Sequence, residues 1–529
     1  MKYELKWMLS AILICGTTAV LTSCSDQSDN PAPQPEGGIV DNDLAVKCIN
    51  GTFIGKKTDN VIVYKGIPFV GQQPVGNLRW KAPVEYTADN GVYEAYEYGK
   101  GACQPEGVVP SMGEDCLYLN VWKAEDKSDE KKPVMVWIHG GAFEFGAAAF
   151  SLFDCDNFIR ENPDVIVVTV AYRLGVFGYF HLSHLQGGEA FPDAQNLGPL
   201  DQLMGLKWVH ENIAAFGGDP DNVTIYGESA GAGSVSTLPL LKGSHAYFKR
   251  IIAQSGSPTL TRSAEEAIEC TNTMMDVLGC KTIEDLLKVD ARKLADESEA
   301  VRLRIAPERD GIHLPLDPHQ AYADGAVKDL DLLVGCNLRE FDWFYAVLGD
   351  EGMKILYDDR KARKFDRLPE KERDLIENFL KNVKGEGSEA ECRLFDQLWF
   401  NAPVMRMAES QAKAGGRAFI YYFTAEPGHG VELEIVFHHQ NKDASLGKVF
   451  DDTFAKTMRK MWVQFAKTGN PSLAADISPD GKEKAWPLYD SENRRVMVLD
   501  EFDIHPEKEA DRKIVDWDRT YGLTKDYLF

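Results

Sequence analysis

The sequence is short of positive charge: 58 lysines and arginines stand against 82 aspartates and glutamates, which gives a formal net charge of −24. A surface this acidic repels phosphate backbones and anionic lipid headgroups, so we expect no nucleic-acid partner. The 10 cysteines are too few for a fold held together by disulfides. A hydrophobic fraction of 44% and a charged fraction of 26% exclude a disordered or fibrous chain. These quantities indicate a large acidic globular protein and leave its function open.

The N-terminus lacks an apolar run of the length that spans a bilayer. The apolar stretch from Met8 to Leu21 is shorter than the about 20 residues that a span needs. Lys2 and Lys6 precede it, in the order typical of a secretory signal. It ends in Leu21-Thr-Ser-Cys24, which resembles the lipobox of bacterial lipoproteins, where the cysteine is lipidated. We predict a lipoprotein signal peptide over residues 1–23 and lipidation of Cys24; the alternative is a plain signal peptide followed by a chance cysteine.

The residues after Cys24 have the composition of a flexible tether. Residues 25–38 are rich in Asp, Ser, Pro and Gln, and no second linker or internal repeat follows them. We therefore predict a tether over residues 24–43 and a single domain over residues 44–529. The mature protein is expected in the bacterial cell envelope, on the outer membrane or the periplasmic face. Its lipid anchor would be its only membrane contact, and the compartment would be oxidising.

Short apolar runs alternate with helical stretches along the rest of the chain. Strands are predicted at 134–138, 165–170, 223–226, 250–254, 332–336 and 418–423. A helix is predicted over 199–216, because a proline lies near its start, Leu203, Leu206, Val209 and Ile213 form an apolar stripe, and a Gly-Gly pair ends it. Continuous apolar strands separated by helices indicate an α/β fold with a mostly parallel sheet covered on both faces. The span from 260 to 415 is more helical and charged, and is expected to be an insertion between late strands.

The segment from Val223 to Gly231 joins a predicted strand, a G-x-S-x-G pattern and a helix. It reads Val223-Thr-Ile-Tyr-Gly-Glu-Ser229-Ala-Gly231. A serine hydroxyl is a poor nucleophile that must be exposed beside a base, and a sharp strand-to-helix turn with flanking glycines exposes it. The helix behind the turn directs N–H groups at the reacting carbonyl oxygen. This pattern predicts Ser229 as a nucleophile, with a structural turn as the alternative.

A second glycine-containing loop follows the predicted strand 134–138. It reads His139-Gly-Gly141-Ala142-Phe143. Small residues at a strand end present backbone N–H groups, and the HGGG-type loop of esterases occupies this place in the chain order. An ordinary glycine turn is the alternative. Because Ser229 follows on the same chain, we predict that this loop binds an oxyanion.

Several longer blocks resemble the type-B carboxylesterases, the cholinesterase-like branch of the α/β-hydrolase fold. The resemblance runs from about residue 45 to residue 525 and rests on these blocks: Glu114-Asp-Cys-Leu-Tyr-Leu-Asn-Val-Trp122, Asn196-Leu-Gly-Pro-Leu-Asp-Gln202, Phe216-Gly-Gly-Asp-Pro-Asp-Asn-Val-Thr-Ile-Tyr-Gly-Glu-Ser-Ala-Gly231, Gln254-Ser-Gly-Ser257, Phe465-Ala-Lys-Thr-Gly-Asn-Pro471 and Trp486-Pro487. It implies an α/β-hydrolase fold and a serine carboxylic ester hydrolase that acts on small-molecule esters.

The same chain order places an acid and then a histidine after the serine, each on a loop that leaves a strand. Strand 332–336 is followed by Asn337-Leu-Arg-Glu340, and strand 418–423 by Glu426-Pro-Gly-His429-Gly430. The family patterns Gly-x-Asn-x-x-Glu and His-Gly-x-Glu point to the same two residues. We therefore predict a Ser229–His429–Glu340 triad.

Nearby residues leave alternatives open. The family has glycine where this chain has Phe341, and Asp342 competes for the acid's role if both acids lie on one extended loop. His438 and His439 compete for the role of the base, but adjacent side chains diverge, so we interpret them as loop residues and expect no paired metal site. Glu228 is expected to be a buried hydrogen-bonding partner that points away from the oxyanion.

The resemblance also carries expectations for cysteines and substrates. It implies a Cys103–Cys116 disulfide, and a second small loop would pair Cys270 with Cys280. The remaining positions have no assigned partner; they are Cys48, Cys155, Cys336, which we interpret as a buried thiol, and Cys392. Animal cholinesterases carry in the first loop a tryptophan that stacks on choline, and residues 104–115 contain no aromatic residue. Choline esters are therefore not the expected substrates.

These residues together predict a two-step acyl transfer that needs no metal or cofactor. The backbone N–H groups of Gly141, Ala142 and Ala230 are expected to bind the oxyanion. An anchored adhesion protein is an alternative, because neuroligin-like relatives keep the fold without the nucleophile. A lipase is a further alternative, against which the lack of an amphipathic apolar lid counts. The natural ester and the oligomeric state do not follow from the sequence.

Overall fold

The computed structural model describes residues 42–105, 107, 109, 111–125, 130–439 and 448–528. The predicted signal peptide, Cys24 and residues 24–41 of the predicted tether lie outside these residues.

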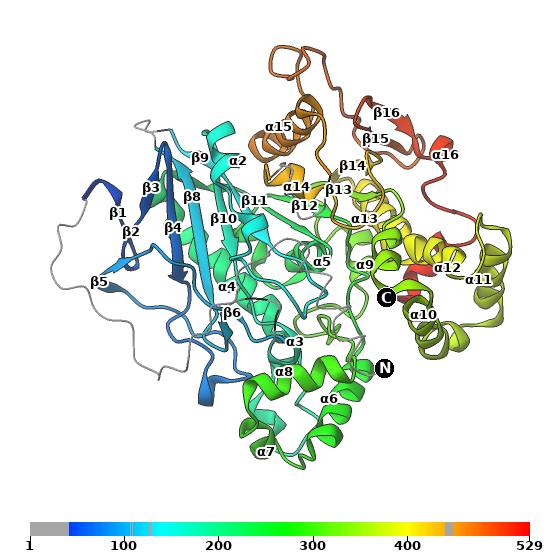
Figure 1. The fold of residues 1–529 in the computed structure, drawn as a ribbon, viewed down its shortest axis with the longest axis horizontal. Coiled ribbons are helices and arrows are strands. Elements are labelled where there is room, and N and C mark those ends of the chain that lie inside the picture. The colour runs from blue at the N-terminus through cyan, green and yellow to red at the C-terminus, as the bar shows by residue number, and fades with distance from the viewer. Residues whose placement is uncertain are drawn as a thin grey trace.

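An 11-stranded sheet runs through the molecule (Figure 1). Its strands are β3 (Lys56–Thr58), β4 (Val61–Pro68), β8 (Tyr118–Ala124), β9 (Lys132–Ile138), β10 (Ile166–Val170), β11 (Gly218–Glu228), β12 (Arg250–Gln254), β13 (Asp331–Asn337), β14 (Arg417–Phe423), β15 (Arg495–Leu499) and β16 (Ile504–Lys508). Their order is β16-β15-β14-β13-β12-β11-β9-β10-β8-β4-β3. From β15 to β10 each strand is parallel to its neighbour, whereas β16, β8, β4 and β3 pair antiparallel at the two ends.

Two small sheets accompany the large one, and helices cover it. The small sheets contain β1 (Ala45–Cys48), β2 (Asn50–Ile54) and β5 (Asp89–Glu94), and β6 (Gly101–Ala102) and β7 (Met112–Gly113). The α-helices are α2 (Asp156–Glu161), α3 (Gly175–Gly178), α4 (Leu197–Asn212), α5 (Ala230–Thr237), α6 (Ala264–Leu278), α7 (Ile283–Leu287), α8 (Ala291–Ala300), α9 (Pro318–Ala323), α10 (Phe341–Arg363), α11 (Glu370–Asn382), α12 (Ser388–Phe395), α13 (Ala402–Lys413), α14 (Leu433–Val436), α15 (Asp452–Thr468) and α16 (Glu509–Arg512).

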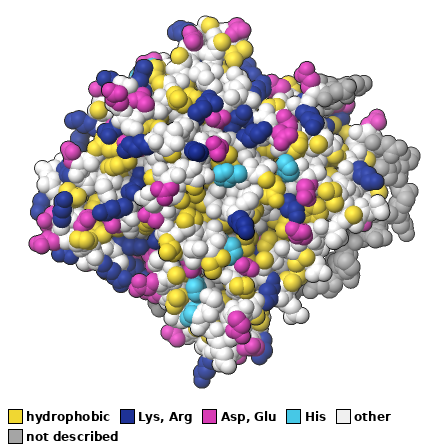
Figure 2. Space-filling view, turned by 180° about the vertical axis from the view of Figure 1, so that it is seen from behind, with side chains coloured by type: hydrophobic (Ala, Val, Ile, Leu, Met, Phe, Trp, Pro, Cys, Tyr) yellow, Lys and Arg dark blue, Asp and Glu magenta, His cyan; other side chains and the backbone are white. Residues whose placement is uncertain are grey.

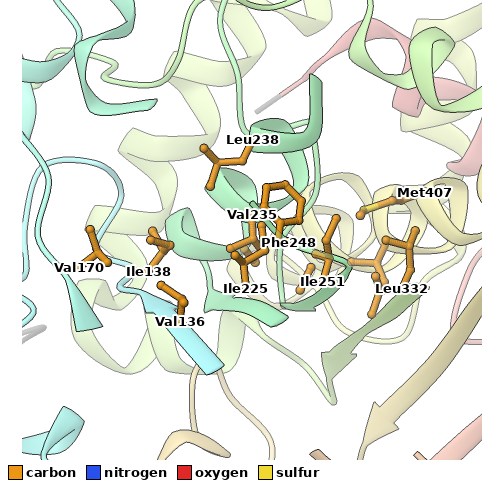
Figure 3. Close-up of a cluster of buried hydrophobic side chains, with 14 of the residues drawn as sticks. Val136, Ile138, Val170, Ile225, Val235, Leu238, Phe248, Ile251, Leu332 and Met407 are labelled. Carbon is orange, nitrogen blue, oxygen red and sulfur yellow. The ribbon is translucent and has the colours of Figure 1, made fainter. Parts of the chain in front are cut away.

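The central strands are apolar throughout because both of their faces are buried. Alternate residues of β9 enter two different cores: Val136 and Ile138 pack with helices α4, α5 and α13, whereas Met135 and Trp137 pack with α2 and α15. Figure 3 shows the first of these cores, where side chains of neighbouring strands meet Val235 of α5. Helices on both faces fix the positions of the strand ends from which the catalytic loops leave.

The strands predicted from the sequence are confirmed as β9 to β14, with boundaries that differ by a few residues. The helix predicted over 199–216 is α4 followed by the 3-10 turn Ile213–Phe216. The helical span from 260 to 415 is divided by β13: helices α6 to α9 precede this strand and α10 to α13 follow it. Figure 1 shows the two groups in different places, with α6, α7 and α8 at one end and α10, α11 and α12 on another side.

The cysteines depart from the sequence prediction. Cys103, Cys116, Cys270 and Cys280 all carry free thiols, so neither predicted disulfide is formed among the described residues. Cys103 and Cys116 belong to different apolar clusters, and the Cys270 thiol donates instead to the carbonyl oxygen of Arg304 at 3.4 Å. The other described cysteines are also free and buried: Cys48, Cys155, Cys336 and Cys392.

The surface carries both signs of charge. Figure 2 shows acidic and basic side chains interspersed with apolar ones over the displayed face. Within the described ranges, no helix is both long and apolar enough to cross a membrane.

Candidate active site

Ser229 lies at the sharp turn between β11 and α5. Its backbone has φ 55° and ψ −122°, a conformation that costs an L-residue about 1–3 kcal/mol and that must be held by its surroundings. Two hydrogen bonds hold it: the Ser229 N–H donates to the carbonyl of Gln254 at 2.9 Å, and the Gly233 N–H donates to the carbonyl of Ser229 at 2.9 Å. Ser229 is half-buried, whereas both adjacent residues are buried. The turn therefore presents this side chain alone.

The two glycines of the pattern are required by close backbone approaches. A Cβ atom at Gly227 would lie 2.5 Å from the carbonyl carbon and oxygen of Gly231, and one at Gly231 would overlap the carbonyl oxygen of Ile138. Any larger residue at either position would push α5 away from β9 and β11. The turn in the structure thus has the geometry that the G-x-S-x-G pattern predicts.

Glu340 and His429 meet beside this turn, each on a loop that leaves the carboxyl end of a strand. The Nδ1 atom of His429 lies 2.7 Å from Oε2 of Glu340. The second oxygen of Glu340 accepts hydrogen bonds from the Ser255 hydroxyl and from the Asn337 N–H, both at 2.6 Å. Glu340 is fully buried. These contacts fix the position of the carboxylate, so that its other oxygen, Oε2, faces the imidazole and can orient it.

The other imidazole nitrogen faces Glu228. Nε2 of His429 lies 3.1 Å from Oε1 of Glu228, and both groups are buried. Glu228 is therefore buried as expected, but it faces the histidine, which the sequence interpretation did not foresee. In the described part of the chain, the hydroxyl of Ser229 donates no hydrogen bond to His429. A carboxylate thus lies beside each ring nitrogen, but among the described residues neither Nε2 of His429 nor Oε1 of Glu228 has a hydrogen-bond partner.

A third buried carboxylate, Glu432, lies next to this pair and was not singled out from the sequence. It accepts hydrogen bonds from the side-chain amides of Gln254, at 2.9 Å, and of Asn337. Burial acts to lower the pKa of His429, but the carboxylates of Glu228, Glu340 and Glu432 outweigh it and raise that pKa to about 9. Burial raises the pKa of Glu228 to about 8. The signal for Glu432 was present in the His-Gly-x-Glu pattern.

The loop after β9 approaches the serine from the other side. Gly140 lies so close that a Cβ atom there would be 3.2 Å from Cβ of Ser229. Gly141, Ala142 and Phe143 all have positive φ angles, 106°, 55° and 62°. Within the described residues, the N–H groups of Gly141 and Ala142 donate to no backbone carbonyl. The N–H of Ala230 begins α5 and belongs to the first turn, whose N–H groups have no partner within the helix.

Comparison with known proteins places this geometry in a family. Residues 42–513 match the model of the carboxylesterase family. The chain belongs to the carboxylesterase family. Its serine turn, buried acid and histidine therefore sit in a serine carboxylic ester hydrolase of the α/β-hydrolase fold.

Two bacterial relatives are similar over most of this esterase. The para-nitrobenzyl esterase of Bacillus subtilis (strain 168) is 34% identical over 495 residues, which cover 88% of this chain and 96% of the relative. The crystal structure of the Geobacillus stearothermophilus carboxylesterase EST55 at pH 6.2 has a TM-score of 0.79 and 33% identity, and covers 89% of this chain and 99% of that one. The cholinesterase of Mus musculus is 30% identical over 499 residues, 83% of this chain and 79% of the relative.

The position of Asp342 separates it from the histidine of the esterase. Glu340 is the N-cap residue of α10, so Asp342 lies in the first turn of the helix and not on an extended loop. Its carboxylate pairs with Arg393 and, at 3.1 Å, with Arg339. Residues two apart on a helix point in different directions. The predicted competition between the two acids therefore does not arise in this geometry.

Phe341 fills the apolar wall behind the histidine. It is fully buried, and its ring lies 4.7 Å from that of Phe344 and 5.9 Å from that of Phe400. These two neighbours lie 5.2 Å and 4.8 Å from the imidazole of His429. Phe400 comes from the π-helical segment Asp396–Asn401, a local widening often found at functional sites. The bulky residue thus supports the histidine from behind the acid.

His438 and His439 lie away from the catalytic loops, as loop residues. The Nε2 atom of His439 lies 2.8 Å from the carbonyl of Asp154, and Nδ1 of His438 lies 3.2 Å from that of Asn157. In the described ranges of the esterase, no group of three or more His, Cys, Asp or Glu residues is arranged to hold a metal ion.

Proposed function

We propose that Ser229, His429 and Glu340 form the catalytic triad with which this esterase hydrolyses small-molecule carboxylic esters through an acyl-enzyme. The observation that carries the proposal is the 2.7 Å contact between His429 and the buried Glu340, on loops that converge on the strained turn of Ser229. Glu340 and His429 meet at the ends of two strands, and Glu228, the residue before Ser229, lies 3.1 Å from the same imidazole. A purely structural role would not require a nucleophile in so strained a conformation.

Acylation begins when the Ser229 hydroxyl turns to Nε2 of His429, in place of the Glu228 carboxylate. The imidazole takes the hydroxyl proton while Oγ attacks the ester carbonyl carbon. Glu340 keeps the ring oriented and stabilises the imidazolium. The N–H groups of Gly141, Ala142 and Ala230 donate to the developing oxyanion, each worth about 10²–10³ in kcat. The tetrahedral intermediate collapses, the ester C–O bond breaks, and His429 returns the proton to the leaving alkoxide.

Deacylation repeats these steps with water. His429 takes a proton from a water molecule, whose oxygen attacks the acyl carbon. The second tetrahedral intermediate releases the carboxylic acid and returns the proton to Ser229 Oγ. The residues of the chain supply every proton transfer in this scheme.

The backbone of Ala142 is strained, which the sequence does not reveal. Its N–H can replace that of a third glycine, but its φ of 55° costs a residue with a Cβ atom about 1–2 kcal/mol. The neighbouring Gly141 needs its glycine more strictly, because a Cβ atom there would overlap the carbonyl oxygen of Phe145. These positive φ angles and the close approach of Gly140 to Ser229 support the proposal that the N–H groups of this loop bind the oxyanion.

Labelling with a serine-reactive organophosphonate tests the proposal. We expect stoichiometric labelling that peptide mapping places on Ser229, with loss of 4-nitrophenyl ester hydrolysis in proportion. Ser255 is the internal control, since its hydroxyl is buried and bound to Glu340. A label on another serine, or full activity after labelling, would contradict the proposal. A panel of nitrophenyl and nitrobenzyl esters of varied acyl length would then define the preferred substrate.

For the location we propose an exported enzyme, lipid-anchored at Cys24 in the bacterial cell envelope. The support is the order of charged, apolar and small residues before Cys24 and the polar composition of the residues after it. Under this proposal residues 44–529 work as one domain at the end of a tether.

A further inference from the structure

A cavity of about 780 Å³ lies between α6 and α10 and reaches the oxyanion loop. Ala142 forms part of its wall, and residues that recur every three or four positions on α6 and α10 line it, among them Glu266 and Cys270 on the first helix and Gly352 and Arg360 on the second. Its volume is within the range of small-molecule sites, about 300–1,000 Å³. The cavity therefore offers space for the part of an ester that extends away from Ser229.

The wall of this cavity carries nearly equal numbers of cationic and acidic residues, whereas the chain as a whole has a net charge of −24. Its cationic residues are Arg302, Arg304, Arg360, Arg363, Lys364 and Arg367, and its acidic residues are Glu144, Glu265, Glu266, Glu269, Glu299, Asp359 and Asp526. Burial raises the pKa of Glu144 to about 8, so this carboxyl next to the oxyanion loop is mostly protonated at neutral pH. The wall then offers positive charge to a ligand only where a cationic side chain lacks a carboxylate partner of its own.

Three of the six cationic residues of the wall have close carboxylate partners. Glu266 pairs with both Arg304 and Lys364, and Arg363 pairs with Glu269 at 2.9 Å and with Asp359 at 2.7 Å. The Glu266 carboxylate therefore pairs with two cations, whereas the exposed Arg363 pairs with two carboxylates.

Arg360 is left without such a partner. Its side chain is 12% exposed, and its ionic contact with Asp359 is 3.7 Å, which is too long for a hydrogen bond. Its guanidinium donates no hydrogen bond among the described residues, and its Nε is buried without an acceptor. The guanidinium lies 5.5 Å from the ring of Trp399. A buried guanidinium with unused donors is costly, and a carboxylate that accepts two of its N–H groups removes this cost.

We propose that this cavity binds the anionic end of an ester substrate, with a carboxylate on Arg360 and the ester carbonyl at the oxyanion loop. The proposal rests on the function assigned to Ser229 and names the substrate class: esters that carry a carboxylate, in the acyl or in the alcohol part. Arg360 is a specificity-determining residue in this account. Arg304 and Lys364 share the single carboxylate of Glu266, so these three side chains together add positive charge to the same wall.

Two matched pairs of esters test this substrate class and distinguish its two sources. Mono-4-nitrophenyl adipate is compared with 4-nitrophenyl hexanoate for the acyl side, and the hexanoate ester of 4-hydroxybenzoate with phenyl hexanoate for the alcohol side. The ratio of kcat/KM for the anionic ester over that for the neutral ester is measured in each pair. Arg360→Gln should lower this ratio by about 10- to 100-fold, mainly through KM, in the pair whose carboxylate lies on the side of the ester that enters the cavity. Arg360→Lys should restore part of the ratio, since it keeps the charge and loses the bidentate geometry.

Lys361→Gln is the matched control. It removes one positive charge from the next residue of α10, an exposed lysine that pairs with Asp366 outside the cavity, and should leave both ratios unchanged. Adipate itself should inhibit the wild-type enzyme competitively, a readout that does not depend on how well a variant folds.

An unchanged ratio in Arg360→Gln for both pairs, or no competitive inhibition by adipate, would overturn the inference. Turnover of the neutral hexanoates would then still support the proposed function. Failure to hydrolyse any of the four esters, with Ser229 unlabelled by the phosphonate, would overturn the proposed function as well.

Discussion

Glu340 and Asp342 are two positions apart in the sequence, and the structure gives them separate surroundings. Glu340 is buried against His429, Ser255 and Asn337, whereas the side chain of Asp342 is 34% exposed and neutralised by arginines. The sequence could not decide between them, because the decision depends on where α10 begins. The helix starts directly after Glu340, and this start turns Asp342 away.

Replacing the proposed triad acid, Glu340, should therefore lower activity far more than replacing Asp342. Glu340→Gln removes the charge that stabilises the imidazolium and should lower kcat by up to about 10⁴, roughly 5 kcal/mol. Asp342→Asn is the matched control and should lower kcat less than about threefold, because it changes only the contacts of Asp342 with Arg339 and Arg393, which do not include His429. Both are measured as kcat on one activated ester. A severe loss in Asp342→Asn with a mild loss in Glu340→Gln would reverse the assignment.

Glu228 should set the pH dependence of the enzyme. Its carboxylate 3.1 Å from Nε2 contributes to the raised pKa of His429, and His429 must be neutral to act as a base. Glu228→Gln should therefore lower the pKa of His429 and move the acidic limb of the kcat/KM profile to lower pH. The profile is measured with a 4-nitrophenyl ester across about pH 5 to 10.

Glu426→Gln provides the control for this experiment. Glu426 precedes His429 on the same loop, but its side chain is 41% exposed and pairs with Lys448 at 3.0 Å. Its replacement should leave the acidic limb in place. A limb that stays fixed or moves to higher pH in Glu228→Gln would show that Glu228 does not control the charge of His429.

At the scale of elements, the parallel strands followed from the sequence because burial on both faces makes them continuously apolar. The serine turn followed too, since Gly227 and Gly231 are local requirements of its backbone. The strand that divides the span from 260 to 415 was also predicted, but the placement of helices α6 and α10 on either side of the cavity was not. This placement depends on long-range packing of amphipathic helices whose sequences fit several arrangements. The His-Gly-x-Glu pattern contains Glu432, but its role beside the histidine was missed because its partners, Gln254 and Asn337, come from distant strands.

The loops of the esterase are tied to its helices by buried ion pairs. Arg173, shortly after β10, donates to Asp201 of α4 through Nε at 2.7 Å and through Nη2 at 2.6 Å, and its Nη1 donates to the carbonyl of Lys81. Both side chains are almost fully buried. This pair explains the acid of the block Asn196-Leu-Gly-Pro-Leu-Asp-Gln202, which carried part of the resemblance.

Breaking this pair should destabilise the fold strongly. Asp201→Asn leaves a buried guanidinium without its counter-charge, which costs about 3–5 kcal/mol. We expect a clearly lower midpoint of thermal unfolding, followed by circular dichroism. Asp358→Asn is the control, because it breaks a surface pair between Lys354 and Asp358 that is worth about 0–1 kcal/mol. Equal midpoints for the two variants would contradict the structural role of the buried pair.

At the scale of the whole molecule, the chain is acidic and its proposed anchor is a lipid. We therefore expect the enzyme to be held at a membrane by this lipid alone. Cys24→Ala should move esterase activity from the membrane fraction to the soluble fraction of cells. The physical reason is that a polar surface with a charge of −24 gains nothing from anionic lipid once the acyl chains are absent. Cys48→Ala, a buried cysteine of the folded domain, is the control and should stay in the membrane fraction. An unchanged distribution of Cys24→Ala would refute lipidation.

The central claim is that Ser229 is the nucleophile of an ester hydrolase. It is tested most directly by kcat of Ser229→Ala on 4-nitrophenyl hexanoate, with circular dichroism to verify that the variant is folded. The members of a catalytic triad act as a unit, so for the proposed triad we predict that kcat falls by about 10³ to 10⁶ while the thermal midpoint stays close to that of the wild type. A folded Ser229→Ala variant that retains near-normal turnover would contradict the account.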